Sequence, residues 1–379
     1  MPMSLSSIVD FLQPVNLSLL SNDEGYRDTQ LGKHIKVNEG TLPDITQADM
    51  VIIGAGESRG AGYVLNGHKA ADAIRSALYN LYYWHAQVSI VDLGNVKLGQ
   101  TIQDSYAALR TVVSELILQN KKVVIIGGSH DLTLAQYHAY TSIPTLVNAV
   151  VTDAKIDLDL EARLPSDHFL EELFTGLPNH LNHYAHIGFQ SYFMHPHMLE
   201  TIDKLRFDCF RLGVVREDIE EMEPVIRDSH MMSFDISAIQ NAQAPANIVT
   251  PNGLNGEEAC VLMQYAGMSW KTSTIGLYGY QSELDRNGLT AIQMAQMIWY
   301  IIDGIQKGKK ESPLSDTERF KEFHIAFSDI DTNFLQSKST GRWWMQLHNN
   351  EWIPCSYKDY LVASKNEIPE RWLRALERE

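Results

Sequence analysis

VVIIGGSHD, residues 123–131, is the stretch that decides the fold class of this chain. Its first four residues are Val and Ile, which favour β-strands, and two glycines end the run. An unbroken apolar run without polar alternation is typical of a parallel strand that is buried on both faces. His130 and Asp131 follow the glycines, so polar side chains lie where the predicted strand ends.

Seven other apolar runs resemble this one, and most of them end at a glycine or a polar residue. Together they give eight predicted strands: 50–54, 88–93, 123–127, 146–153, 185–189, 207–214, 231–235 and 273–278. Amphipathic helices separate several strands, as the apolar spacing within residues 71–81 and 106–119 indicates. This alternation predicts an α/β protein with three α/β/α layers and an eight-stranded, mostly parallel sheet.

The composition indicates which classes of protein this chain can belong to. The 379 residues are 44% hydrophobic and 21% charged, which is typical of a globular protein with a large core. A formal net charge of −16 argues against nucleic acid or an anionic membrane as a partner. The first residues lack the positive start and long apolar run of a signal peptide, and the three cysteines are far apart. We therefore expect a cytoplasmic protein.

Three of the predicted strands are followed by residues that suit a metal ion. His130 follows the first run, Asp153 and Asp157 stand in TDAKID, and Asp235 stands in SFDIS. Because the carboxyl ends of parallel strands meet at one edge of a sheet, one imidazole and three carboxylates would lie together. Oxygen-rich ligation with a single imidazole suits Mn²⁺ and similar divalent ions.

The segments GGSH, DAKID and SFDIS, in this order, resemble the signatures of the ureohydrolase superfamily of arginases, agmatinases and formimidoylglutamases. The resemblance extends over about residues 50–308 through IIGAGESRGAGYVLNGHKAADAIRSAL, VDLGNV, PNGLNGEEA and GYQSELDRNGLTAIQMAQMI. Length and loops are nearest to formimidoylglutamases. The resemblance implies an arginase-like fold, a homo-oligomer, and a hydrolase that acts on C–N bonds of a linear amidine or guanidino compound.

The resemblance also implies a set of metal ligands, since members of the family hold two manganese ions. Four residues assigned to one of these ions are all present: His130, Asp153, Asp157 and Asp235. The second ion would share two of these aspartates and would also need a histidine at position 155 and an aspartate at position 237. The chain has Lys155 and Ser237 there. We therefore predict a site for one divalent cation at most, with Mn²⁺ as the expected ion.

Two interpretations of Lys155 remain open. In the first, one divalent cation and the Lys155 ammonium balance the three carboxylates, so that the lysine stands in for the second ion. In the second, no metal binds and Lys155 forms salt bridges with Asp153 and Asp235, while His130 is an ordinary hydrogen-bonded histidine. The first predicts a slow hydrolase, and the second predicts a catalytically inactive pseudoenzyme that binds a small metabolite or a protein.

Three other positions bear on substrate binding and catalysis. Gly279 stands where the family carries a glutamate near the substrate, which argues against ordinary amidine recognition. His168, in PSDHF, lies where some members carry a histidine near the leaving group, and is a candidate proton shuttle beside Asp153 and Lys155. Glu57 lies in GAGESRG, whose spacing departs from the dinucleotide-binding pattern, and is a candidate ligand contact in the cleft.

The predicted division of the chain has three parts: an N-terminal extension (1–49), a ureohydrolase-like α/β domain (50–308) and a C-terminal extension (309–379). The C-terminal extension carries four of the seven tryptophans. Large aromatic rings bury well, so we expect this extension to pack on the domain or at an oligomer interface.

Overall fold

A computed structural model describes residues 5–21, 25–327 and 330–378. Within them, a ten-stranded sheet has the order β1-β4-β3-β5-β10-β9-β6-β7-β8, with β2 paired to β4. The strands are β1 (Leu12–Gln13), β2 (Lys36–Val37), β3 (Met50–Gly54), β4 (Ile90–Val96), β5 (Lys122–Ile126), β6 (Val147–Thr152), β7 (Leu181–Phe189), β8 (Asp208–Arg211), β9 (Met231–Asp235) and β10 (Thr274–Tyr278).

The eight predicted strands are confirmed as β3 to β10, and their pairings are parallel. The predicted count is short by two, because β1 and β2 add two residues each beside β4. Of these, β1 is antiparallel and β2 is parallel. The sheet is thus mostly parallel, as predicted, and its carboxyl-end edge gathers the loops that follow β5, β6 and β9.

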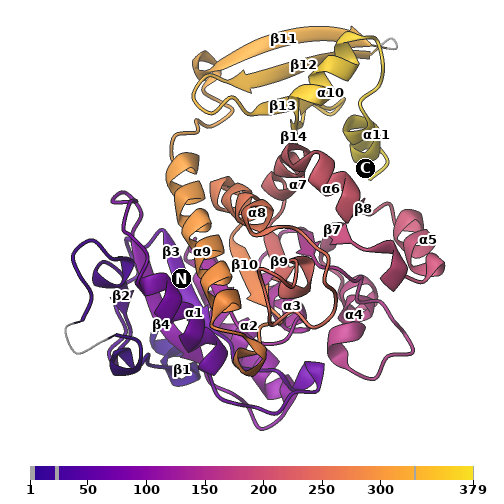
Figure 1. Ribbon diagram of the computed structural model, residues 1–379. Coiled ribbons are helices and arrows are strands. Elements are labelled where there is room, and N and C mark those ends of the chain that lie inside the picture. Colours follow the sequence, from indigo (N-terminus) through magenta and orange to yellow (C-terminus); the bar gives the residue numbers. More distant parts are fainter. Residues whose placement is uncertain (1–4, 22–24, 328–329, 379) are drawn as a thin grey trace.

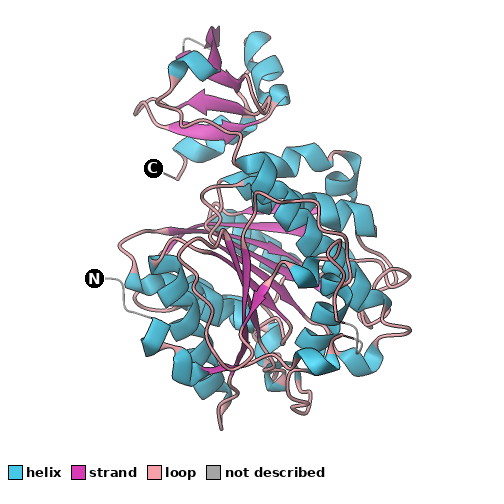
Figure 2. Ribbon diagram, turned by 90° about the vertical axis from the view of Figure 1, so that its left-hand side faces the viewer, coloured by secondary structure: helices cyan, strands magenta, loops and turns pink. Residues whose placement is uncertain are grey.

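Helices cover both faces of this sheet (Figures 1 and 2). They are α1 (Lys69–Tyr79), α2 (Ile102–Leu118), α3 (Leu132–His138), α4 (Phe169–Thr175), α5 (Pro196–Lys204), α6 (Leu212–Glu217), α7 (Met222–Arg227), α8 (Gly256–Met268) and α9 (Leu289–Gly308). Residues of α1, α8 and α9 share one core cluster, and residues of α2, α3 and α4 share another. The three-layer α/β/α prediction is confirmed.

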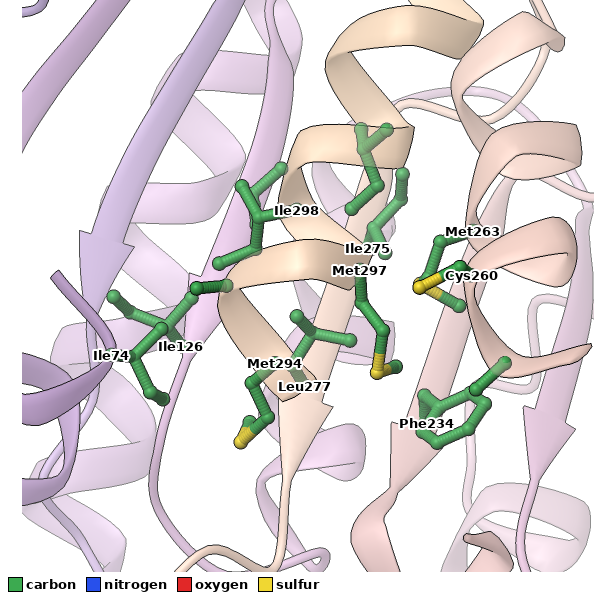
Figure 3. Packing of buried hydrophobic residues seen from close by; sticks show 14 of the residues in the cluster. Ile74, Ile126, Phe234, Cys260, Met263, Ile275, Leu277, Met294, Met297 and Ile298 are labelled. Atoms are coloured by element: carbon green, nitrogen blue, oxygen red, sulfur yellow. The ribbon is translucent and has the colours of Figure 1, made fainter. Parts of the chain in front are cut away.

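Alternating side chains of each strand enter the two cores. Along β3, Met50 and Ile52 belong to the core under α1, α8 and α9, whereas Val51 and Ile53 belong to the opposite one. Figure 3 shows part of the first core, where the strand residues Ile275 and Leu277 lie beside α9. Since both faces are buried, the strands are apolar throughout, which explains why their sequences carry no alternation.

The residues after α9 form a second, smaller unit above the large sheet (Figure 1). Its four-stranded antiparallel sheet has the order β11-β12-β13-β14. The elements are β11 (Phe320–Phe327), β12 (Ile330–Ser337), β13 (Trp343–Gln346), β14 (Trp352–Cys355), α10 (Tyr357–Ser364) and α11 (Glu370–Leu376). Trp343 and Trp372 belong to a core of its own, and Trp344 packs on the face toward Leu314. We call residues 309–378 the C-terminal unit.

Two smaller observations concern the chemistry of the chain. Cys209, Cys260 and Cys355 are free thiols. In the part of the chain that the structure describes, no helix combines the length and the apolar character needed to cross a membrane.

Candidate metal centre

The candidate site lies at the carboxyl-end edge of the large sheet. Asp153 directly follows β6, Asp235 is the last residue of β9, and His130 lies four residues beyond β5. In the sheet, β9 is the direct neighbour of β6, and β10 separates β9 from β5. Neighbouring strand ends therefore bring residues that are about 100 positions apart in the sequence into one cluster, as predicted from the strand ends.

The His130 imidazole is the centre of this cluster. Its Nδ1 atom lies 3.0 Å from Asp153 Oδ2, 2.9 Å from Asp157 Oδ2 and 4.0 Å from Asp235 Oδ2. Ligand atoms of His130, Asp153 and Asp157 all lie within 4.8 Å of one another. All four side chains are buried. A nitrogen and several carboxylate oxygens at such distances fit a single divalent ion of the Mn²⁺ type.

Residues behind the imidazole fix its orientation. His130 Nε2 lies 3.1 Å from Ser233 Oγ, which in turn lies 2.6 Å from Thr133 Oγ1. The edge of the Phe169 ring packs on the imidazole, with ring centroids 4.9 Å apart. Hydrogen bonding of this kind to the far nitrogen is what orients metal-binding histidines in general, and it leaves Nδ1 facing the carboxylates.

Burial and mutual repulsion raise the pKa values of two carboxyls in the cluster, whereas hydrogen bonds lower the pKa of the third and raise that of the histidine. Burial opposes the charge on His130, but its hydrogen bonds to Asp153 and Asp157 raise its pKa well above 6.5. Burial also disfavours ionised Asp153, yet the hydrogen bonds from His130 and Ser237 lower its pKa to about 2. Burial and the charge of Asp153 raise the pKa of Asp157 well above 3.8 and that of Asp235 to about 6. The hydrogen bonds to Asp153 and Asp157 thus favour the protonated form of His130 in this arrangement.

Ser237 is hydrogen-bonded to two of the candidate ligands. Its hydroxyl donates to Asp153 Oδ1, and its backbone N–H donates to Asp235 Oδ1 at 2.7 Å. The Lys155 N–H adds a third donor, 3.2 Å from Asp153 Oδ1. Asp153 Oδ1, the oxygen that does not face His130, therefore accepts from two donors of the protein itself, and one of them is the side chain at position 237, to which the resemblance assigns a further metal ligand.

Lys155 requires a correction. Its ammonium lies 3.8 Å from Asp167 Oδ1, and 40% of its side chain is exposed. Among the described carboxylates, Asp167 alone lies within 4.0 Å of it. The interpretation in which Lys155 forms salt bridges with Asp153 and Asp235 is therefore wrong for this structure, because the ammonium pairs with Asp167 instead.

Glu57 also requires a correction, because it does not face the cleft. Its side chain is 2% exposed and accepts hydrogen bonds from Arg59 Nε at 2.9 Å and Arg59 Nη2 at 2.6 Å. Both oxygens of this buried carboxylate accept from Arg59, and Glu57 is not among the residues that line the cavity over the cluster. The signal was in the sequence, since the arginine stands only two residues further on in GESRG.

Of the other two predicted positions, Gly279 lies at the cavity over the cluster and His168 does not. Gly279 lines the cavity above the cluster, and its backbone has φ +81°. A Cβ atom there would overlap the Asp235 carboxylate, so no side chain fits while Asp235 keeps this place. His168 is half-buried at the start of α4 and does not line the cavity, although its neighbours Ser166 and Asp167 do.

The cavity over the cluster has a volume of about 190 Å³. Its rim is apolar at Leu164, Ile248 and Val249, and Tyr63 and Gln281 complete the wall. Sequence reasoning did not single these residues out. Tyr63 and Gln281 lie in segments that carry the family resemblance, whereas Leu164, Ile248 and Val249 lie in loops without a recognisable pattern. Ile248 is 67% exposed, which is unusual for isoleucine and marks the mouth of the cavity.

Comparisons with known proteins point to one family. The family model described as the arginase family matches residues 48–303. A formimidoylglutamase from Photorhabdus laumondii is 22% identical over 247 residues, which cover 62% of this chain and 78% of that protein.

Solved structures show the same fold. A formiminoglutamase from Trypanosoma cruzi, solved with Mn²⁺, has a TM-score of 0.65 and 16% identity, covering 74% of this chain and 99% of that one. A formimidoylglutamase from Bacillus subtilis has a TM-score of 0.65 and 17% identity, covering 80% and 99%. The family match spans more than half of the chain and includes every residue of the cluster. The chain therefore belongs to the arginase family.

Proposed function

We propose that this protein hydrolyses C–N bonds in a linear amidine, as a formimidoylglutamase does, and that it works with one divalent ion, Mn²⁺. The observation that carries the proposal is the convergence on His130 Nδ1 of Asp153 and Asp157, at 3.0 and 2.9 Å, with Asp235 at 4.0 Å. These four side chains would hold the ion. A divalent ion in such a site acts as a Lewis acid and lowers the pKa of water.

The limit of one ion rests on positions 155 and 237. The Lys155 side chain leaves the cluster for Asp167, and the Ser237 hydroxyl donates to Asp153. Neither position offers the anionic or imidazole ligand that a second ion would need. With a single Lewis acid, turnover should be slow compared with an enzyme that has two ions, each contributing several kcal/mol to barrier lowering.

The mouth of the cavity supports a substrate that carries an acidic group. The Lys155 ammonium is half exposed, and its only ion pair in the described chain, with Asp167, is long at 3.8 Å. Such a weak pair is readily exchanged for a substrate carboxylate. We therefore assign Lys155 to substrate binding at the rim, with the amidine carbon held below it and the apolar side chains of Leu164 and Ile248 excluding water from the sides.

The test is metal content and turnover of the same preparation. After loading with Mn²⁺ and dialysis, we expect one ion per chain by elemental analysis, and slow loss of formimidoylglutamate followed by NMR. Asp157→Asn should lower both the bound Mn²⁺ and the turnover. The loss should exceed the roughly 10- to 100-fold that follows when a residue behind a metal ligand is changed. Asp159→Asn is the matched control, because Asp159 is exposed in the same loop and should leave both unchanged.

One observation favours a second candidate, a binding protein without hydrolysis. The Ser237 hydroxyl donates to Asp153 Oδ1, and His130 Nδ1 lies 3.0 Å from Asp153 Oδ2, so both carboxylate oxygens have protein partners without any ion. In that case the loaded protein would hold no Mn²⁺ and show no turnover, yet would bind formimidoylglutamate saturably. Two ions per chain would contradict the one-ion proposal, and absence of metal, turnover and binding together would contradict both candidates.

A further inference from the structure

The cavity over the metal centre holds a buried amide that the fold does not use. Gln281 lines this cavity and is 6% exposed. It directly precedes the short 3₁₀-helix Ser282–Leu284, but its side chain does not cap that helix. In the part of the chain that the structure describes, the Gln281 amide makes no hydrogen bond, and neither of its polar atoms is closed off from the cavity. Buried polar groups are nearly always hydrogen-bonded, so this amide is available to a ligand.

The other buried polar side chains of the cavity, apart from the candidate metal ligands, are occupied by the protein. The Ser129 hydroxyl donates to a backbone carbonyl at 3.2 Å, and the Ser237 hydroxyl donates to Asp153. Asn247 is the second amide in the wall. Its Nδ2 atom donates to three backbone carbonyls, and its Oδ1 atom accepts from two backbone N–H groups. Asn247 therefore shapes the loop, whereas Gln281 has no such role.

Gln281 lies close in sequence to the position where the resemblance assigns a glutamate near the substrate. That position is Gly279, where a Cβ atom would overlap the Asp235 carboxylate. No side chain at position 279 can therefore contact a substrate while Asp235 keeps its place. Gln281 stands two residues further on and lines the same cavity, so its amide is placed to make the contact that position 279 cannot make.

The chemistry of an amidine defines what this contact would be. Like a guanidinium, a protonated amidine carries N–H donors and has no acceptor, so the wall must supply an acceptor. The carboxylates of the cluster would hold the ion, and Asp167 is paired with Lys155 at the mouth. The side-chain carbonyl oxygen of Gln281 is then a buried acceptor that no donor of the described chain uses. It is neutral, so it would bind the amidine without forming an ion pair.

We propose that Gln281 is a substrate-binding residue, and that its side-chain oxygen accepts a hydrogen bond from the amidine N–H of the substrate. This inference rests on the proposed hydrolysis of a linear amidine and names a residue that determines its specificity. The substrate would be held at two separate points, with its carboxylate on Lys155 at the rim and its amidine on Gln281 inside the cavity.

The test compares binding of formimidoylglutamate by variants of the full-length chain loaded with Mn²⁺, by titration calorimetry and from KM. Gln281→Met keeps the length of the side chain and removes the acceptor, so binding should weaken by roughly tenfold or more. Gln281→Glu keeps an acceptor and should bind at least as tightly as the unaltered chain, because an ionised acceptor strengthens the hydrogen bond. Gln103→Met is the matched control, since Gln103 is exposed in α2 and does not line the cavity.

Two further measurements separate substrate binding from a structural role. The Mn²⁺ content and the urea midpoint of Gln281→Met should equal those of the unaltered chain, because the Gln281 side chain has no hydrogen bond to lose. A lower urea midpoint would show a structural role and overturn the proposal. So would equal affinities of Gln281→Met and the unaltered chain, equal weakening in Gln281→Glu and Gln281→Met, or no binding by the unaltered chain.

Failure of the proposed function gives a different result. A chain that binds formimidoylglutamate without hydrolysing it would contradict the hydrolase, yet weaker binding by Gln281→Met would still support the contact. Conversely, hydrolysis with the same KM in Gln281→Met and the unaltered chain would leave the hydrolase standing and overturn the role of Gln281.

Discussion

Ser237 shows at the scale of one residue how this chain departs from a site for two ions. A serine hydroxyl carries no charge, and here it donates a hydrogen bond to Asp153. It therefore stabilises that carboxylate and adds no anionic ligand for a second cation. Lys155, the other departing position, keeps its backbone N–H on Asp153 and sends its side chain to Asp167. The backbone at both positions thus still faces the cluster.

We therefore expect Lys155→His with Ser237→Asp to bind two Mn²⁺ ions per chain where the unaltered chain binds one. The aspartate would add a carboxylate beside Asp153, and the histidine would replace a side chain that has only a weak pair to lose. Elemental analysis after Mn²⁺ loading measures the ratio. Each single change supplies only one new ligand and should leave the ratio near one. An unchanged ratio in the double variant would contradict the expectation.

The sequence was sufficient to predict which residues meet at the candidate site, but not where each side chain points. His130, Asp153 and Asp235 could be placed together because each follows a buried parallel strand. Lys155 follows one as well, yet its long side chain turns toward Asp167, which stands in another loop. Charge balance alone could not reveal this, because it does not specify the direction in which a long, flexible side chain points.

At the scale of elements, the strands that could be predicted are those buried on both faces. Apolar runs gave β3 to β10, whereas β1 and β2 are two residues long and carry no such signal. The strands of the C-terminal unit were not predicted either. In β11, buried Phe320 and Phe327 enclose six residues that are exposed or half-buried, and the pattern there is too irregular to mark a strand.

The packing of α8 on α9 depends on glycine. A Cβ atom at Gly304 would overlap the Gln264 carbonyl oxygen, and one at Gly267 would overlap that of Ile301. Backbone atoms cannot turn aside as a side chain tip can, so the two helices would have to separate. Met263 of α8 and Met297 of α9 belong to the same core (Figure 3), and their packing contacts would be lost if the helices separated.

Gly304→Ala should therefore lower the free energy of unfolding, since overpacking costs about 1–3 kcal/mol. Gly213→Ala, in α6, is the control, because its Cβ atom would meet nothing within 4 Å and alanine gains roughly 1 kcal/mol in a helix. Urea unfolding of both variants measures the difference. Equal stabilities would show that α8 and α9 adjust without loss.

At the scale of the whole molecule, ion pairs join the C-terminal unit to the α/β domain. Asp208 of β8 accepts from Arg374 at 2.9 Å, from Arg378 at 2.6 Å and from His183, whose Nε2 lies 3.0 Å away. Arg371 reaches Glu221 at 3.2 Å.

Asp208 makes this junction sensitive to acid. Burial would raise the pKa of Asp208, but the hydrogen bond from His183 and the charges of Arg378 and Arg374 lower it below 3.8. A group whose pKa is lowered on folding stabilises the folded state above its unfolded pKa. That stabilisation is lost as the pH falls from 3.8 through the lowered value.

We expect Asp208→Asn to cost about 1.5–3 kcal/mol at pH 7, because it removes a charged acceptor from partly buried hydrogen bonds with two arginines and His183. The stability difference between the two proteins should shrink as the pH falls below 3.8, because acid then removes the same charge from the unaltered chain. Urea unfolding at pH values from 7 to about 3 measures this difference. Glu370→Gln is the matched control, since Glu370 is 77% exposed and its pair with Arg374 should contribute less than about 1 kcal/mol. A difference that stays constant with pH would show that Asp208 acts through packing rather than through its charge.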